Sequence, residues 1–293
     1  MTEHYKGNIG LGKASCAHLA KQKAHIFLAA RTPSKAEAAI SEIKETVPEA
    51  QITFLELDLA SLESVKNAAA TFNAASSRLD VLMNNAGIMA VPEGLTEQGY
   101  EVQFGTNHMG HALFTKLLMP KLLETAKEEG SQVRIVNVSS MGHKYAPTGG
   151  ISFPSLKRDM KEDSTWVRYG QSKLANILFT KALAERYPGV KSVAIHPGGV
   201  DTNLSAGFQN SHPWLTAVLK PVLFKLLKTP EEGSLTQVFA AVSPEAESGS
   251  YYTPTAQKTE LAKPAEDTEL IKKLWDWTEK ELGAYGPWPE NSG

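Results

Sequence analysis

Apolar residues gather in short runs at 24–30, 51–57, 79–83, 132–138 and 190–195, and longer segments with helix signals separate these runs. A mostly apolar run of this length is typical of a strand buried on both faces, as in a parallel sheet with helices on each side. Strands that alternate with helices indicate βαβ units. The pattern therefore predicts an α/β fold with a doubly wound parallel sheet.

Helix and strand signals continue to the end of the chain. Thr229 and Pro230, followed by two acids, form a typical helix start, because threonine caps free N–H groups and proline fits the first turn. Apolar residues recur on one face of residues 269–282, which predicts an amphipathic closing helix. Residues 249–252 suit a short last strand, and residues 267–293 are expected to be a C-terminal helix and an irregular tail.

Length and composition fit one globular domain. At 293 residues the chain lies within the range of large doubly wound domains, so we interpret residues 1–293 as a single domain. The formal net charge of −2 gives no electrostatic reason to expect nucleic acid or an anionic membrane as a partner. The single cysteine, Cys16, excludes an internal disulfide and fits a reducing compartment.

The sequence carries no signal for a membrane span or for export. It lacks an apolar run long enough to cross a bilayer. Residues 1–6 lack the apolar core of a secretory signal. We therefore predict a cytoplasmic protein. A homodimer is left open, and no metal site is predicted, because His108 and His111 have no ligand partners at usable spacing.

Tyr169 and Lys173 lie four residues apart at the start of an apolar helical segment. On a helix this spacing places the phenol and the ammonium on one face. A nearby cation lowers the pKa of a phenol, whose ordinary value near 10 is too high for acid–base work at neutral pH. The pair is therefore a candidate proton-transfer device, although an exposed lysine beside a packed tyrosine explains the same spacing.

Three further motifs follow apolar runs along the chain. They are Asn-Asn-Ala-Gly at 84–87, Ser-Ser at 139–140 and His-Pro-Gly-Gly-Val-Asp-Thr at 196–202. Together with Tyr-Gly-Gln-Ser-Lys at 169–173, they resemble the motifs of the short-chain dehydrogenase/reductase superfamily, and within it the retinol-dehydrogenase-like and WW-domain-oxidoreductase-like branch. The resemblance implies a Rossmann fold and hydride transfer between a nicotinamide cofactor and a carbonyl or alcohol of a small molecule.

The resemblance implies roles for four residues. Ser140 would hydrogen-bond the substrate oxygen, and Tyr169 would donate or accept its proton, although by residue type alone either Ser139 or Ser140 could bind that oxygen. Lys173 would lower the pKa of Tyr169 and hold the nicotinamide ribose. Asn107, a polar residue in an otherwise apolar segment, would position a water that links Lys173 to solvent. The alternative is a buried asparagine with ordinary partners.

A glycine-rich turn precedes the first helical segment. Gly7, Gly10 and Gly12 would let backbone amides approach a pyrophosphate, and the following helix N-terminus favours an anion. Asn8 and Leu11 complete the expected phosphate-binding turn. A plain helix entry would contain the same glycines.

Arg31 and Lys35 follow the run at 24–30, where dinucleotide folds distinguish two cofactors. A carboxylate there holds the ribose hydroxyls of NAD, whereas arginine accommodates the 2′-phosphate of NADP. No Asp or Glu occurs between residues 24 and 36. The sequence therefore favours NADP, with an ordinary surface arginine as the alternative.

The other expected cofactor contacts depend on the resemblance. Asp58 would contact the adenine amino group, although it could also cap a helix that begins near Ser61. Asn85, Ala86 and Gly87 would border the adenosine half of the cofactor. The residues expected near the nicotinamide carboxamide are Pro197, Gly198, Val200 and Thr202.

Two segments are expected to face an apolar substrate. Residues 142–168 form an insertion that contains Trp166 and is interpreted either as part of the substrate wall or as a surface loop. Residues 204–228 resemble the substrate-covering helices of the family, and a core-covering helix pair is the alternative.

The resemblance fails at residues 1–6. The family has an apolar strand that ends in Thr-Gly before its glycine-rich turn, whereas Tyr5 and Lys6 stand there with no apolar run before them. We therefore expect the first strand to be missing. The rival prediction is an N-terminally truncated protein that is catalytically impaired or only binds its ligand.

Overall fold

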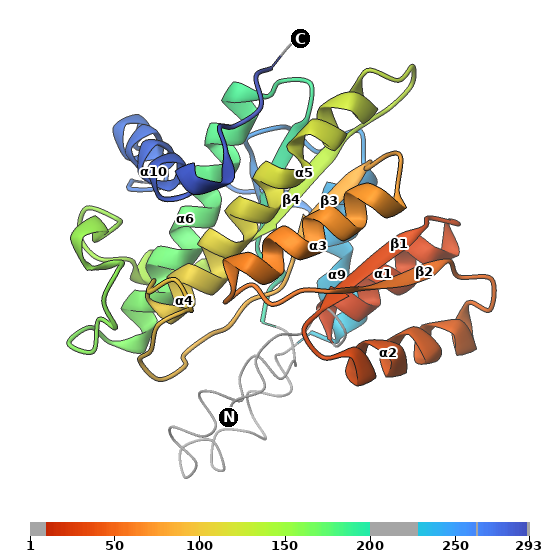
Figure 1. The fold of residues 1–293 in the computed structure, drawn as a ribbon, viewed down its shortest axis with the longest axis horizontal. Coiled ribbons are helices and arrows are strands. Elements are labelled where there is room, and N and C mark those ends of the chain that lie inside the picture. Colours follow the sequence, from red (N-terminus) through yellow and green to blue (C-terminus); the bar gives the residue numbers. More distant parts are fainter. Residues whose placement is uncertain (1–9, 200–227, 262, 292–293) are drawn as a thin grey trace.

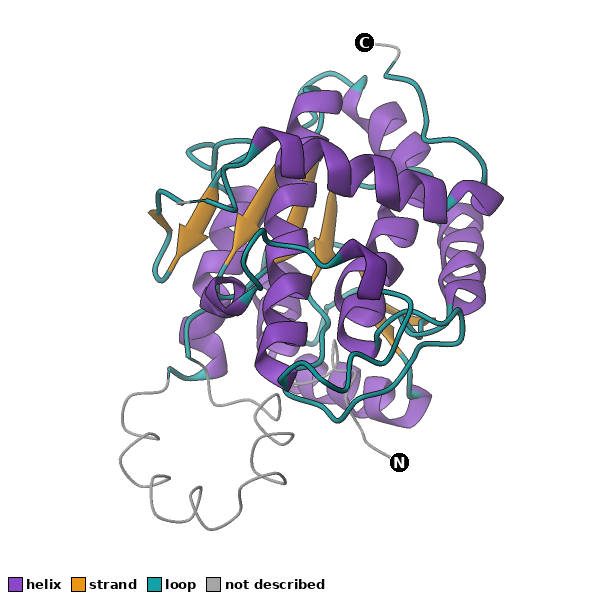
Figure 2. Ribbon diagram, turned by 90° about the vertical axis from the view of Figure 1, so that its left-hand side faces the viewer, coloured by secondary structure: helices purple, strands orange, loops and turns teal. Residues whose placement is uncertain are grey.

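The computed structural model describes residues 10–199, 228–261 and 263–291, and helices cover both faces of its parallel strands (Figure 1; Figure 2). The strands are β1 (Ile26–Ala30), β2 (Ile52–Glu56), β3 (Val81–Asn84), β4 (Arg134–Val138), β5 (Lys191–Ile195), β6 (Tyr251–Thr253) and β7 (Gln257–Lys258). All paired neighbours run parallel except β6 and β7. The predicted α/β fold with a parallel sheet is confirmed.

The helices form two layers around the strands (Figure 1). One layer contains α3 (Leu62–Ala75), α4 (Val102–Phe104), α5 (Gly110–Ala126) and α6 (Thr165–Arg186), with α10 (Thr268–Glu281) packed on α6. The other layer contains α1 (Leu11–Lys21), α2 (Pro33–Thr46) and α9 (Pro230–Val242). Within the described ranges, no helix combines the length and apolar character that a membrane span requires.

The strands are divided between two sheets. β1 pairs with β2, and the second sheet has the order β3-β4-β5-β6-β7. Among the described residues no strand lies between β1 and β3. Every residue of β4 is buried, whereas β1 and β3 contain partly exposed apolar residues such as Ile26 and Val81. Residues 1–9 lie outside the described part of the chain, so the expected absence of a first strand stays a prediction.

Helix packing and a series of hydrogen bonds between side chains join the two sheets. α1 contacts both β1 and α9, and α9 covers β4 and β5. Ser15 Oγ donates to Gln237 Oε1, and Gln237 Nε2 donates to Asn85 Oδ1 at 2.7 Å. On the opposite face α3 packs against both β2 and α5. The first two strands are thus held beside β3 without a backbone ladder between β1 and β3.

The structure corrects the predicted boundaries of the insertion. α6 begins at Thr165, so Trp166 lies in this helix and not in the loop before it. Ser164 explains this start, because its Oγ accepts a hydrogen bond from the Val167 N–H. The rest of the insertion contains two short 3₁₀ helices, η2 (Met141–Tyr145) and η3 (Phe153–Ser155). Residues 204–227 of the expected substrate-covering segment lie outside the described residues.

Other predicted elements agree with the structure. Thr229 caps α9 in a capping box with Glu232, as the sequence indicated. The tail after α10 is irregular as predicted, yet it belongs to the core: Trp288 is buried, with its ring 4.6 Å from that of Trp275 and 6.0 Å from that of Phe179. β7 was missed, because two residues are too short to show a period.

Candidate active site

The predicted catalytic residues meet at the carboxyl end of β4. Ser140 follows β4, while Tyr169 and Lys173 lie on α6 and are both buried. Lys173 Nζ lies 5.7 Å from the centre of the Tyr169 ring and donates to the Val138 carbonyl at 3.0 Å. The four-residue spacing therefore places the phenol and the ammonium together, as predicted.

The two serines have different partners. Ser139 Oγ donates to the backbone carbonyl of Lys173 at 2.7 Å, so its hydroxyl ties β4 to α6. Ser140 Oγ accepts a hydrogen bond from the Gly142 N–H at 3.0 Å, and Ser140 is the side chain that lowers the pKa of Tyr169. Of the two serines, only Ser140 thus acts on the candidate proton donor.

Burial controls the ionisation of both Tyr169 and Lys173. It raises the pKa of Tyr169 to about 12, against a lowering by the hydrogen bond with Ser140. It lowers the pKa of Lys173 to about 8. Both shifts have one cause, since a buried phenolate or ammonium loses its hydration. The pKa of Tyr169 is therefore high in this structure. The sequence predicted that Lys173 lowers this pKa, but the group that lowers it is Ser140.

Asn107 lies in a π-helical turn, η1 (Gly105–Met109), between α4 and α5. Its Oδ1 accepts from the Ile88 N–H at 2.8 Å, and its Nδ2 donates to the Ile88 carbonyl and to Ser172 Oγ, both at 2.9 Å. His111 Nδ1 lies 3.0 Å from the Asn107 carbonyl. The side chain of Asn107 therefore joins the loop after β3 to α6. Its expected part in a water relay stays a prediction.

Two glycines shape the site and were missed by sequence reasoning. A Cβ at Gly142 would lie 2.7 Å from Cε1 of Tyr169, and a Cβ at Gly170 would lie 2.6 Å from the Ala146 nitrogen. Contacts this short do not occur for real side chains, so α6 reaches η2 only because both positions are glycine. The only signal in the sequence was the glycine directly after Tyr169.

The start of α1 has the features of an anion site. Gly10 is the N-cap residue, with a φ of 57° in the region that favours glycine, and as a glycine it has no side chain that could cap the helix. The first turn holds no acid, so the N–H groups near Leu11 and Gly12 meet no negative side chain of that turn. Gly7 and Asn8 lie outside the described residues.

Arg31 and Asp58 lie at the carboxyl ends of β1 and β2 and form an ion pair, with Nη1 3.9 Å from Oδ2. Asp58 Oδ1 also accepts from the Ala60 N–H at 2.9 Å. The cap of α3 is Ser61, so Asp58 is not the helix cap. Lys35 is in the first turn of α2. Of the residues predicted to recognise the adenosine half and its 2′-phosphate, Arg31 and Asp58 thus lie in contact.

The loop after β3 passes directly beside Lys173. A Cβ added at Gly87 would lie 3.2 Å from Lys173 Nζ and 3.0 Å from Asn107 Oδ1. Asn85 is held by Gln237, and Ala86 packs against the main core. At the end of β5, Pro197 is buried and Gly198 has a φ of 92°. Val200 and Thr202 lie outside the described residues.

Comparison with known proteins identifies the family. The family model described as short chain dehydrogenase matches residues 7–212. The short-chain dehydrogenase/reductase drtF of Aspergillus calidoustus is 40% identical over 292 residues, which cover 94% of this chain and 91% of the relative. The chain therefore belongs to the short-chain dehydrogenase/reductase family of oxidoreductases.

Further relatives agree with the predicted branch. Human retinol dehydrogenase 13 is 37% identical over 286 residues, covering 96% of this chain and 83% of the relative. The crystal structure of an uncharacterized protein from Mycobacterium Paratuberculosis has a TM-score of 0.74 and 32% identity, covering 96% of this chain and 92% of the other. The expected retinol-dehydrogenase-like relationship is thus confirmed.

Proposed function

We propose that this protein transfers a hydride between NADP(H) and a carbonyl or alcohol group of an apolar small molecule, by a Ser-Tyr-Lys mechanism. The observation that carries the proposal is the meeting of Ser140, Tyr169 and Lys173 beside the loop at Gly87, where a side chain would crowd Lys173 Nζ. A proton donor and an orienting hydroxyl that lie close together can both reach a single substrate oxygen.

The described residues fit a nicotinamide dinucleotide. The uncapped start of α1 would receive the pyrophosphate. Arg31 and Lys35 would hold the 2′-phosphate, and Lys173 would hold the nicotinamide ribose. Gly87 agrees with this fit, because a side chain there would crowd Lys173 Nζ, the group expected to hold the ribose. When bound, the cofactor supplies or accepts the hydride.

The residues of this chain orient the substrate oxygen and move its proton. Ser140 Oγ, held by the Gly142 N–H, would hydrogen-bond that oxygen. Tyr169, with its pKa raised to about 12, stays protonated at neutral pH and would give its proton to the oxygen during reduction. Lys173, fixed by the Val138 carbonyl, would stabilise the phenolate that this leaves behind.

An apolar and aromatic patch beside Ser140 supports an apolar substrate. Met141 and Tyr145, both on η2, are 53% and 58% exposed, so both side chains are accessible to a ligand beside Ser140. The Tyr145 ring is 6.0 Å from the Trp166 ring, which in turn is 6.4 Å from the Tyr169 ring. This row of rings leads from the surface to the candidate proton donor. Relatives that carry the name retinol dehydrogenase are consistent with such a substrate.

The choice of NADP depends on this chain's own residues. Solved structures of the same fold include an NADPH-bound carbonyl reductase and an NADH-bound ketoacyl reductase, so the fold permits either cofactor. The position of Arg31 at the end of β1 favours the cofactor with the extra phosphate. The Asp58 carboxylate partly neutralises the charge of Arg31, because its Oδ2 lies 3.9 Å from Arg31 Nη1.

The proposal is tested by following NADPH absorbance with a panel of apolar aldehydes and ketones, including retinal, steroid ketones and aliphatic aldehydes. We expect turnover of at least one panel member with NADPH and a much lower rate with NADH. Tyr169→Phe in the same assay supplies the background. A parent protein no faster than Tyr169→Phe on every compound would reject the proposed function.

A further inference from the structure

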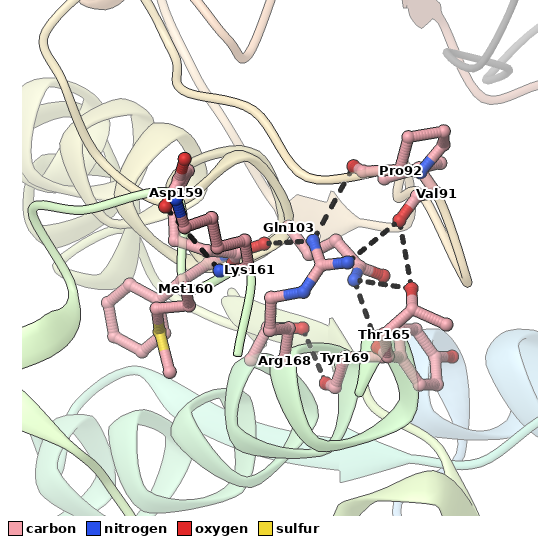
Figure 3. A network of polar contacts seen from close by, with 12 residues as sticks. Val91, Pro92, Gln103, Asp159, Met160, Lys161, Thr165, Arg168 and Tyr169 are labelled. Atoms are coloured by element: carbon pink, nitrogen blue, oxygen red, sulfur yellow. Dashed lines mark hydrogen bonds and ion pairs between the residues drawn. The ribbon is translucent and has the colours of Figure 1, made fainter. Parts of the chain in front are cut away.

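Arg168, the residue before Tyr169, is a buried cation that contacts groups far away in the sequence (Figure 3). Its Nη1 lies 3.2 Å from a carboxylate oxygen of Glu101, which is completely buried. Nη1 also donates to the Pro92 carbonyl at 3.5 Å, and Nη2 donates to the Val91 carbonyl at 3.3 Å. One guanidinium thus connects α6, the residue before α4 and the loop after β3.

Side chains hold this loop, residues 88–92, along its whole length. Asn107 binds both backbone groups of Ile88 at one end. Gln103 Oε1 accepts from the Ala90 N–H at 3.0 Å, and Ala90 itself has a strained φ of 53°. At the other end Thr165 Oγ1 donates to the Val91 carbonyl at 2.9 Å, beside the bond from Arg168. We call residues 88–92 the clamped loop.

Gln103 completes the connection to the start of α6. Its Nε2 donates to the carbonyl and to Oγ1 of Thr165, at 3.0 and 3.2 Å (Figure 3). Arg168 therefore lies in a continuous network that joins the clamped loop to the first turns of α6. This network includes Arg168, the residue next to Tyr169. It does not include Ser140, which is placed by β4 and η2.

The buried ion pair of Arg168 and Glu101 is incompletely satisfied. Arg168 Nε is buried and has no hydrogen-bond partner among the described residues. Burial raises the pKa of Glu101, and Arg168 and the Phe104 N–H only partly oppose this rise. Replacement of a buried pair by uncharged residues of similar volume is often neutral or stabilising. Because the pair is incompletely satisfied and holds the first turns of α6, we interpret its role as geometric.

We propose that Arg168, through Glu101 and the carbonyls of Val91 and Pro92, is the positioning residue that sets the distance between Tyr169 and Ser140. The inference rests on the proposed function. Tyr169 and Ser140 belong to different elements, so a shift of the first turns of α6 changes the gap between their oxygens directly. A misplacement of about 1 Å can lower a rate by roughly 100-fold.

The test separates stability from turnover with three variants. Arg168→Met leaves Glu101 buried without its cation and should lower the melting temperature. The double variant Arg168→Met with Glu101→Gln removes both charges and should regain most of that loss. Its kcat should nevertheless stay roughly 10- to 100-fold below the parent value, with an unchanged KM for NADPH. Arg168→Lys, which keeps the charge but not the forked donor geometry, should be intermediate in kcat.

A matched control and a second readout keep the test decisive. Arg186→Met removes an arginine from the other end of α6, where the guanidinium lies 4.3 Å from the Trp275 ring centre, and should leave kcat unchanged. The pKa of Tyr169, measured as the phenolate absorbance that Tyr169→Phe removes, should fall from about 12 in the double variant, because a displaced phenol meets more water.

The outcomes are distinct. A double variant with the parent's kcat and phenol pKa would mean that the pair is merely structural, and the inference would be wrong. If the parent itself shows no turnover above Tyr169→Phe, the proposed function fails. In that case the phenol titration still decides: a lowered pKa supports the positioning role of Arg168 and an unchanged pKa rejects it.

Discussion

The hydroxyl of Ser139 donates a hydrogen bond to the backbone carbonyl of Lys173 at 2.7 Å. This bond uses the Ser139 hydroxyl to join β4 to α6, while the neighbouring Ser140 lowers the pKa of Tyr169. The two hydroxyls differ in their partners although they are identical in chemistry. We therefore expect a structural role for Ser139 and a catalytic role for Ser140.

Ser140→Ala should mainly lower the rate, whereas Ser139→Ala should mainly lower the stability. Ser140→Ala removes the hydroxyl that orients the substrate, so kcat should fall by 10-fold or more with little change in the melting temperature. Ser139→Ala leaves a buried carbonyl with one partner fewer, so it should lower stability by roughly 1–3 kcal/mol. Thermal unfolding and initial rates of both variants check this. A larger rate loss for Ser139→Ala would reverse the assignment.

Tyr169→Phe should abolish nearly all turnover and keep the fold, because only the transferable proton is lost. NADPH affinity, measured by fluorescence titration, should be unchanged within a few-fold. The control is Tyr187→Phe, since Tyr187 is also buried but donates to the Pro289 carbonyl, away from the site. If Tyr169→Phe kept most of the parent rate, another residue would have to supply the proton.

The buried Lys173 should make stability depend on pH. Its pKa is about 8 in the folded protein against an ordinary value near 10.5, so between these values the unfolded chain binds more protons. Stability should therefore rise with pH from about 8 to 10.5 relative to Lys173→Met, by up to roughly 3 kcal/mol.

Tyr169 acts in the opposite direction at higher pH. Its pKa of about 12 lies above the ordinary value near 10, so the folded state keeps the proton longer and stability should fall as pH rises above 10. Denaturant unfolding of the parent, Lys173→Met and Tyr169→Phe across this range separates the two effects. Curves for the parent and Lys173→Met that stay parallel from pH 8 to 10.5 would contradict the burial of a titrating lysine.

Arg31→Ala should weaken NADPH binding by roughly 10- to 100-fold, the range of a charge-assisted hydrogen bond, and should change NADH binding little. Lys44→Ala, in the last turn of α2, is the control for loss of one surface cation. Calorimetric titration of both cofactors measures the preference. Equal preference before and after Arg31→Ala would remove the basis for NADP.

The absence of backbone pairing between β1 and β3 in the described part of the chain leads to a prediction about the N-terminus. Both are edge strands in the described part of the chain, and both carry apolar residues that are only partly buried. A Val/Ile-rich strand ending in Thr-Gly, added before Gly7, should pair with both edges, because unpaired buried backbone groups cost roughly 1–3 kcal/mol each. We expect a higher melting temperature and tighter NADPH binding than for the chain of 293 residues.

The same extension with two prolines in the added strand is the control, because proline cannot donate to a ladder. Melting curves with and without NADPH compare the three chains. If the strand and its proline version behaved alike, pairing between β1 and β3 would not limit stability or cofactor binding, and the expectation of a missing strand would be wrong.

Local patterns were enough to predict the main strands and their order. Apolar runs marked β1 to β5, because a strand buried on both faces needs apolar residues throughout, and Thr229 marked the start of α9 through its capping chemistry. The four-residue spacing of Tyr169 and Lys173 placed both on one helix face, since helix geometry is itself local.

Contacts between distant segments were decided only by the tertiary structure. The hydrogen bond of Ser139 to Lys173, the ion pair of Arg31 with Asp58 and the burial of Arg168 against Glu101 each join residues that no periodicity relates. The pKa of Tyr169 is the clearest case. The sequence shows a lysine one turn away, but the surrounding core removes water from the phenol, and desolvation depends on every element that packs around it.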